Sequence, residues 1–147
     1  MHKPKNIFVE GPISPEKISD MIKEHQSKQN IGAHDIFLGQ VRSDALNESK
    51  VIAIEYSAYE DMALESWQKM KDELFEKYEL TCMHIKHSLG RVEAGEISFL
   101  VFVSAPHRQS CFDACREAVD KIKKDLPIWG KEILENESHT WKVNEQA

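Results

Sequence analysis

The residues best suited to chemistry lie where an apolar segment meets a predicted helix. His107 and Arg108 directly follow Pro106, which ends an apolar segment, and they precede residues with helical periodicity. Because the N-terminus of a helix carries a partial positive charge, a fixed Arg there is unfavourable unless an anion lies nearby. The pair therefore predicts an anion-binding site, which backbone N–H groups would assist. The alternative interpretation is that His107 caps the chain end and Arg108 pairs with a surface acid.

Two further basic residues, Lys123 and Arg42, occupy suitable positions. On a helical wheel Lys123 lies about 80° from the centre of the apolar face, at the border between core and solvent. A lysine at such a border usually extends its amine into water, whereas near other cations its pKa falls and it can transfer protons. Arg42 ends a predicted strand. Taken alone, it is a solvated strand-end residue.

The elements that must position these residues alternate between strands and helices. Apolar periodicity and turn residues predict them. In chain order they are strand 6–10, a helix capped by Ser14 over 15–28, strand 32–42, a polar loop 43–50, strand 51–57, a helix to Tyr78 that opens with a Ser57–Glu60 capping box, two strands within 81–106 whose connection is bracketed by Gly90 and Gly95, helix 107–125, and a C-terminal hairpin that turns at 136–138.

The composition is that of an ordinary folded chain. Its 147 residues are 41% hydrophobic and 30% charged, with a net charge of −6. The length suits one α/β domain over 1–147 with a mixed sheet and flanking helices. The acidic balance predicts that the surface repels nucleic acid and anionic membranes, so a local basic patch suits a small anionic ligand. The longest apolar run, 97–106, is too short to span a membrane, and the first residues lack a signal peptide's apolar stretch, which predicts a cytoplasmic location.

The placement of cysteine and histidine predicts neither a metal site nor thiol chemistry. Cys111 and Cys115 are four residues apart on one helical face, where a role in the core is favoured over metal binding. Cys111 is a candidate nucleophile at a helix N-terminus, but its place in the apolar stripe favours burial. Cys82 begins an apolar strand, and His84 and His87 point to opposite faces of it. The HExxH, CxxC, Walker and GxSxG motifs do not occur.

Several segments in order resemble the family of large, catalytic subunits of molybdopterin synthase. They are FLGQVR (37–42), LGRVEAGEISFLVFVSAPHR (89–108), FDACREAVDKIKKDLPIWGKE (112–132) and HTW (139–141). The resemblance covers about residues 5 to 142. It implies a hammerhead-type α/β fold with a small additional β subdomain. It also implies a sulfurtransferase of molybdenum cofactor biosynthesis.

In that family the enzyme inserts two dithiolene sulfurs into cyclic pyranopterin monophosphate to form molybdopterin. The resemblance implies that sulfur arrives as a thiocarboxylate on the C-terminal Gly-Gly of a small, ubiquitin-like partner subunit. It further implies a homodimer of the large subunit with one small subunit at each end, a heterotetramer. The chemistry requires proton transfer and charge stabilisation, and no metal or redox cofactor.

The resemblance also implies roles for individual residues. The family's strand-end Arg falls on Arg42, its His-Arg pair on His107 and Arg108, and its helical active-site Lys on Lys123. Arg42, His107 and Arg108 would bind the substrate phosphate. The bound anion would offset the unfavourable placement of cations at a helix N-terminus. Lys123 would act as acid or base and stabilise the thiocarboxylate.

The chain departs from the family pattern at two points. The family's second active-site Lys directly follows the Trp of P-x-W, and here Gly130 holds that place and Lys131 comes next. One step along a strand reverses the side-chain face, so Lys131 assists only if the backbone at Gly130 adjusts, which Gly permits. A family Arg beyond the last Trp has no match, although Lys142 lies nearby. These departures keep open a non-catalytic module that binds a ubiquitin-like partner or phosphorylated ligand. A small phosphate-ester hydrolase using His107 is a second alternative.

Overall fold

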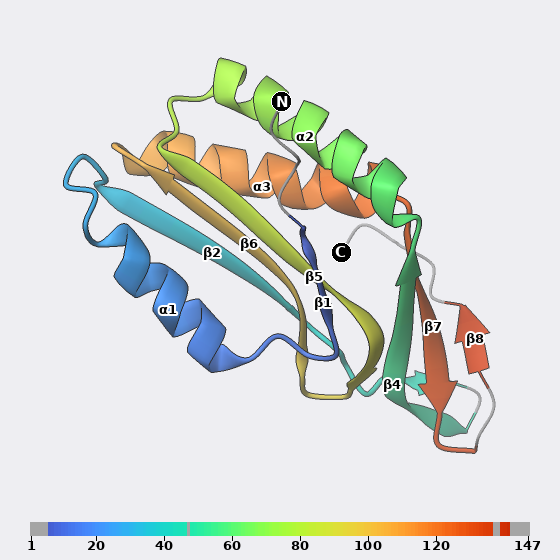
Figure 1. Ribbon diagram of the computed structural model, residues 1–147. Helices are drawn as coiled ribbons and strands as arrows, with labels where there is room; N and C mark the ends of the chain where they lie inside the picture. Colours follow the sequence, from blue (N-terminus) through green and yellow to red (C-terminus); the bar gives the residue numbers. More distant parts are fainter. Residues whose placement is uncertain (1–5, 47, 137–138, 142–147) are drawn as a thin grey trace.

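The computed structural model describes residues 6–46, 48–136 and 139–141, and for 139–141 the backbone alone. The elements of these residues are β1 (Phe8–Glu10), α1 (Pro15–His25), β2 (Ala33–Gln40), β3 (Ala45–Leu46), β4 (Ser49–Ala58), α2 (Glu60–Lys77), β5 (Cys82–Glu93), β6 (Ile97–Ala105), α3 (Arg108–Asp125), β7 (Ile128–Leu134) and β8 (His139–Trp141). Their order confirms the predicted mixed α/β class (Figure 1).

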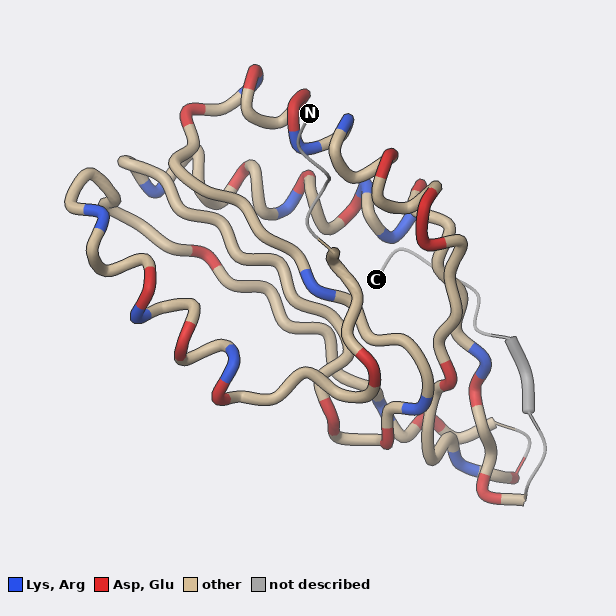
Figure 2. The backbone as a smooth tube through the Cα atoms, viewed as in Figure 1, with Lys and Arg blue, Asp and Glu red and all other residues tan. Residues whose placement is uncertain are grey.

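Strand β6 forms the middle of the layer between the helices. It pairs antiparallel with β2 along one edge and with β5 along the other, while β1 adds to β5 in parallel. Every residue from Ser98 to Ala105 is buried, and β6 carries no charged residue, as Figure 2 shows. A strand apolar on both faces belongs inside a covered sheet. The predicted central placement of this strand is therefore confirmed.

Helices cover both faces of this layer (Figure 1). Helices α2 and α3 pack on one face, against odd-numbered residues of β5 and β6 such as Ile85 and Val101. Helix α1 packs on the opposite face around Leu100 and Phe102. Because side chains alternate along a strand, each residue of β5 and β6 is assigned to one helical layer or the other.

Strand β5 takes part in two sections of the sheet. Its first half, Cys82–His87, pairs with β6, and residues from Gly90 to Glu93 pair with β4. Gly90 has a φ of 78°, a conformation that glycine adopts without steric cost. Gly90 therefore lies within the strand where the pairing changes, and the prediction that it brackets the β5–β6 connection was wrong. Gly95, with a φ of 93°, does lie in that connection.

The second half of β5 joins β4, β7 and β8 into an antiparallel section that we call the β wing (Figure 1). The β wing has its own small core, formed by Val41, Val51, Ile54, Val92 and Leu134. The pairing of β7 with β8 confirms the predicted C-terminal hairpin, whose turn includes residues 137–138 outside the described part. The β wing matches the small additional β subdomain that the resemblance implied.

Two local predictions were wrong. Within the predicted loop 43–50, β3 pairs with the start of β4. Two-residue strands at an exposed edge need no apolar alternation, so the sequence pattern does not reveal them. The predicted capping box is also absent, because Ser57 lies in β4, opposite Trp129, and Tyr59 holds the N-cap of α2 without a side-chain hydrogen bond. The ladder with β7 keeps the chain extended through Ala58.

The other helix ends agree closely with prediction. Ser14 Oγ caps α1 by accepting a hydrogen bond from the Lys17 amide, although α1 ends at His25 rather than near Lys28. Helix α3 begins after His107 at the N-cap and ends at Asp125, before Pro127. The stripe of α2 is buried as expected at Ala63, Trp67, Met70 and Leu74. Among the described residues, no helix is long and apolar enough to cross a membrane.

Candidate active site

A cavity of about 90 Å³ opens where the last turn of α3 meets the start of β7, the end of β2 and the start of β6. Apolar side chains of Phe99, Ile122, Leu126 and Ile128 form much of its wall. Its position follows from local sequence, because Pro127 prevents α3 from continuing and the chain turns directly into β7, which places Leu126 and Ile128 in the cavity wall. The cavity lies on the sheet face that α2 and α3 cover.

Lys123 lines this cavity, at the border between core and solvent that its position on the helical wheel predicted. Its neighbour Ile122 is buried in the main core, while Lys123 itself is exposed at the cavity rim. Its Nζ lies 5.8 Å from the centre of the Phe37 ring, within the range of a cation–π contact. Placement in the last turn is also favourable because the C-terminus of a helix carries a partial negative charge.

His87 faces Lys123 across the cavity, and sequence analysis did not assign it to the site. Burial lowers the pKa of His87 from 6.5 to about 4; hydrogen bonding to the Ser88 carbonyl opposes this shift, and Lys123 reinforces it. Nδ1 lies 2.9 Å from that carbonyl oxygen, which accepts its proton and leaves Nε2 as an unprotonated acceptor. The ring packs against Tyr56 and Phe99, with centroid distances of 4.9 and 5.4 Å.

Tyr56 and Ser98 supply hydroxyl groups to the same cavity. The Tyr56 and Ser98 oxygens are 3.0 Å apart in a hydrogen bond. Burial raises the pKa of Tyr56, the Ser98 hydrogen bond opposes the shift, and Glu132 adds to it, so the phenol stays protonated near neutral pH. Gln40 lines the cavity after a register shift between Gly39 and Gln40. The residues that line the cavity thus combine one cation, Lys123, with neutral hydrogen-bonding groups.

Arg42 lies two residues beyond Gln40 but does not line the cavity. Its side chain is 70% exposed and its guanidinium is 3.5 Å from the Asp44 carboxylate. An exposed pair of this kind contributes little to stability, so Arg42 is not locked in place. The role of Arg42 in binding an anion therefore stays a prediction.

His107 and Arg108 lie at the opposite end of α3 from Lys123. Both are exposed, and His107 makes no side-chain capping hydrogen bond. At a rise of about 1.5 Å per residue, Arg108 and Lys123 are roughly 22 Å apart along the helix axis. The structure therefore does not bring the two groups together within one chain. A cavity that used both would need His107 and Arg108 from a second copy.

Lys131 lies next to the cavity but outside its lining. Gly130 lines it, and a Cβ at Gly130 would come within 2.8 Å of Ile54 Cγ2. The β7–β4 register is regular from Ile133 to Ile128. The backbone adjustment that Lys131 required is absent, and the strand turns its side chain to the face opposite that of Gly130. The structure thus lacks the condition on which a direct role for Lys131 depended, and that role stays a prediction.

Cys111, the candidate nucleophile, is buried. Burial raises its pKa to about 11, and the nearby Asp35 adds to this shift, while a hydrogen bond to the Asp35 backbone opposes it. Its Sγ donates a hydrogen bond to the Val103 carbonyl at 3.3 Å. A protonated, enclosed thiol is a poor nucleophile, which confirms the core position that its place on the stripe predicted.

Comparison with known proteins gives a consistent result. The family model described as MoaE protein matches residues 8–125. Molybdopterin synthase catalytic subunits of Pyrococcus abyssi and Bacillus subtilis are 36% and 35% identical, over 78% and 85% of this chain and 76% of each relative. One from Drosophila mojavensis is 44% identical over 79% of the chain, which spans about a third (32%) of that relative.

Solved structures share the fold. Molybdopterin synthase from Staphylococcus aureus aligns with a TM-score of 0.82 at 32% identity, covering 97% of this chain and 99% of that one. A complex of subunits 1 and 2 of molybdopterin-converting factor from Helicobacter pylori aligns with a TM-score of 0.78, covering 91% and 87%. At 20% identity, the second likeness concerns the fold alone.

Proposed function

Because the chain belongs to the MoaE protein family, we propose that it is the catalytic subunit of a molybdopterin synthase, a sulfurtransferase of molybdenum cofactor biosynthesis. It moves sulfur from the C-terminal thiocarboxylate of a small ubiquitin-like subunit to cyclic pyranopterin monophosphate. The observation that carries this proposal is the position of Lys123 at the rim of a cavity otherwise lined by neutral groups. A single cation beside neutral donors suits an anionic tail.

Lys123 stabilises the negative charge of the thiocarboxylate and of the tetrahedral species formed when sulfur leaves the carrier. Its ammonium also donates a proton to an oxygen that leaves the substrate when the cyclic phosphate opens or water is lost. The carrier tail enters as an extended chain, a common mode for recognition of a terminal carboxylate. Lys123 is exposed at the rim, so the tail meets it on entry.

His87 and Tyr56 orient the pterin rather than exchange protons with it. A histidine with a pKa of about 4 is a weak base at neutral pH, and it remains uncharged beside Lys123. Its Nε2 accepts a hydrogen bond from a pterin N–H, and the Tyr56 hydroxyl supplies a further polar contact. Because the other groups that line the cavity are uncharged, the positive charge of Lys123 acts mainly on the reacting anion.

The substrate phosphate is bound by Arg42 and by His107 and Arg108 of a second copy. Helix α3 separates its two ends by more than the size of the substrate, so one chain cannot supply all these groups to one pocket. In the two-fold homodimer that we propose, the N-terminus of each α3 lies beside the cavity of the other copy, since a two-fold axis makes such contacts reciprocal. Lys131 assists only if the backbone at Gly130 adjusts on binding of the carrier, because its side chain lies on the face of β7 opposite that of Gly130.

The experiment that tests this function mixes the protein with the thiocarboxylated small subunit and the cyclic pterin. Molybdopterin is detected through its fluorescent oxidation product. Formation of product in proportion to carrier consumed supports sulfur transfer. No product despite formation of a complex supports the alternative, a binding module without chemistry. Gly130 favours that alternative, because it replaces the family's second lysine in the cavity wall.

A further inference from the structure

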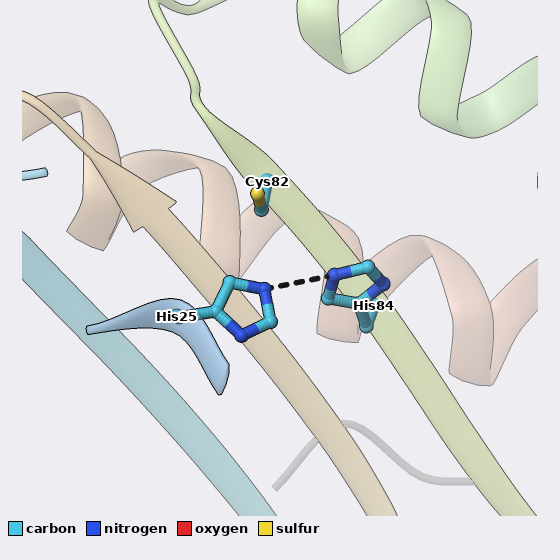
Figure 3. A group of neighbouring side chains, drawn as sticks. All are labelled: His25, Cys82 and His84. Atoms are coloured by element: carbon cyan, nitrogen blue, oxygen red, sulfur yellow. Dashed lines mark hydrogen bonds between the residues drawn. The ribbon is translucent and has the colours of Figure 1, made fainter. Parts of the chain in front are cut away.

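A second group of reactive side chains lies on the sheet face opposite the cavity, beneath α1 (Figure 3). His25 is the last residue of α1, and Cys82 and His84 alternate on β5 and so point to the same side. One ligand atom from each lies within 4.8 Å of the other two. His25 and Cys82 are buried, and His84 is half-buried. This group has no part in the function proposed above.

The two histidines present their Nε2 atoms to each other at 3.1 Å (Figure 3). His25 Nδ1 lies 2.7 Å from the Met21 carbonyl oxygen, which accepts its proton and leaves the Nε2 lone pair directed at His84. A metal-binding His typically donates its other ring N–H to such an acceptor. Tetrahedral zinc holds its nitrogen and sulfur ligands roughly 3.3–3.6 Å apart. The Nε2 separation is close to that spacing without any movement of α1.

Cys82 supplies the third corner. Its Sγ lies within 4.8 Å of one ring nitrogen of each histidine, so a shift of about 1 Å would bring it into the same range. Lys28 Nζ lies 2.9 Å from Sγ. When the sulfur is bound to a metal as a thiolate, Lys28 offsets its negative charge by a charge-assisted hydrogen bond. Phe102 packs 4.7 Å from the His25 ring and closes the apolar side of the group.

We propose that His25, Cys82 and His84 form a binding site for a zinc ion, with the fourth tetrahedral position taken by water. Two imidazoles and one thiolate are a donor set that zinc binds well, and carboxylates, which hard cations prefer, are absent from the group. The bound ion links the C-terminal end of α1 to β5. Zinc therefore stabilises the packing of α1 on the sheet.

The test uses the full chain, stripped of metal with a chelator, and Co²⁺ as a spectroscopic probe. We expect one Co²⁺ per chain, with visible bands of a tetrahedral centre and a near-ultraviolet thiolate-to-cobalt band, both removed by Zn²⁺. Cys82→Ser should abolish the thiolate band, and His84→Gln should weaken Co²⁺ binding at least about 10-fold. The control variants Cys115→Ala and His34→Gln, which alter a core thiol and a neighbouring histidine, should keep both properties.

A second measurement needs no variant. Zn²⁺ should slow alkylation of Cys82 in the unmodified protein, as followed by peptide mass, and should raise its melting temperature. A wild-type spectrum without a thiolate band would overturn the proposal, and so would a band that survives Cys82→Ser. Equal alkylation of Cys82 with and without Zn²⁺ would overturn it as well. None of these readouts depends on sulfur transfer.

Discussion

The charge states of single side chains determine what the cavity can do. Lys123 is its cation, whereas burial keeps His87 neutral and Tyr56 protonated. The helical wheel predicted that Lys123 lies at the border between core and solvent, and the family resemblance assigned it to the active site. His87 was missed, although it shares its strand face with the buried residues Met83 and Ile85. A polar residue on an otherwise apolar face was the signal available.

Replacing Lys123 with Ala should reduce turnover about 100-fold, the usual effect of removing a group that transfers protons and stabilises charge. The measurement is the rate of molybdopterin formation at saturating carrier. Lys124→Ala is the matched control, because Lys124 is the adjacent exposed lysine and does not line the cavity. Near-normal turnover in Lys123→Ala would contradict its assigned role.

His87 should make the protein less stable in mild acid. Its folded pKa of about 4 lies below the ordinary value of 6.5, so between these values the unfolded chain binds more protons. The free energy of unfolding therefore falls as pH decreases from about 6.5 to 4, by roughly 3 kcal/mol from this group, and the effect vanishes above pH 7. Urea unfolding at pH 7, 5 and 4 should show a smaller loss for His87→Gln. Parallel curves for the two proteins would refute the assignment.

At the scale of elements, the order of strands and helices was predictable and several boundaries were not. Helix α3 and strand β6 could be predicted from the sequence because each has its own apolar pattern. The start of α2 depends instead on the ladder between β4 and β7, which are distant in sequence. The meeting of Tyr56, His87 and Ser98 likewise depends on three strands lying side by side. Apolar periodicity along one element predicts whether a side chain lies on its buried or its exposed face, but it does not predict which residues of other strands lie beside it.

The two serines predicted as helix caps should differ in their contribution to stability. Ser14→Ala should lower the free energy of unfolding by about 1 kcal/mol, because Ser14 Oγ accepts the Lys17 amide hydrogen bond at the start of α1. Ser57→Ala is the matched control, since Ser57 lies in β4 and caps no helix. Urea unfolding at pH 7 measures both. An equal loss for the two variants would contradict this account.

At the scale of the whole molecule, the length of α3 separates two groups of predicted site residues. The helix extends over 18 residues, with His107 before its first residue and Lys123 in its last turn. The family resemblance assigned both ends to the active site, and the sequence alone left open whether one pocket draws residues from two chains. The helix separates them, and two-fold symmetry is the simplest way to reunite them.

Mixing two inactive variants should restore activity. In a dimer that combines Lys123→Ala with Arg108→Ala, one pocket carries both substitutions and the other carries neither. Random exchange of subunits makes half the dimers mixed, so about a quarter of normal turnover should return. The measurement is turnover after mixing and exchange, with each variant alone as the control. No recovery, with exchange verified by mass, would show that each pocket draws on one chain.

Strand β5 couples the unfolding of the two sections of the sheet, because it belongs to both. Its hydrogen bonds extend to β1, β6 and β4 along twelve uninterrupted residues, and Gly90 lets it pass from one section to the other. The β wing cannot detach without breaking a strand that also supports the helical layers. Amide protons of β5 should therefore exchange with solvent only when the entire chain unfolds, at one common rate for both halves of the strand.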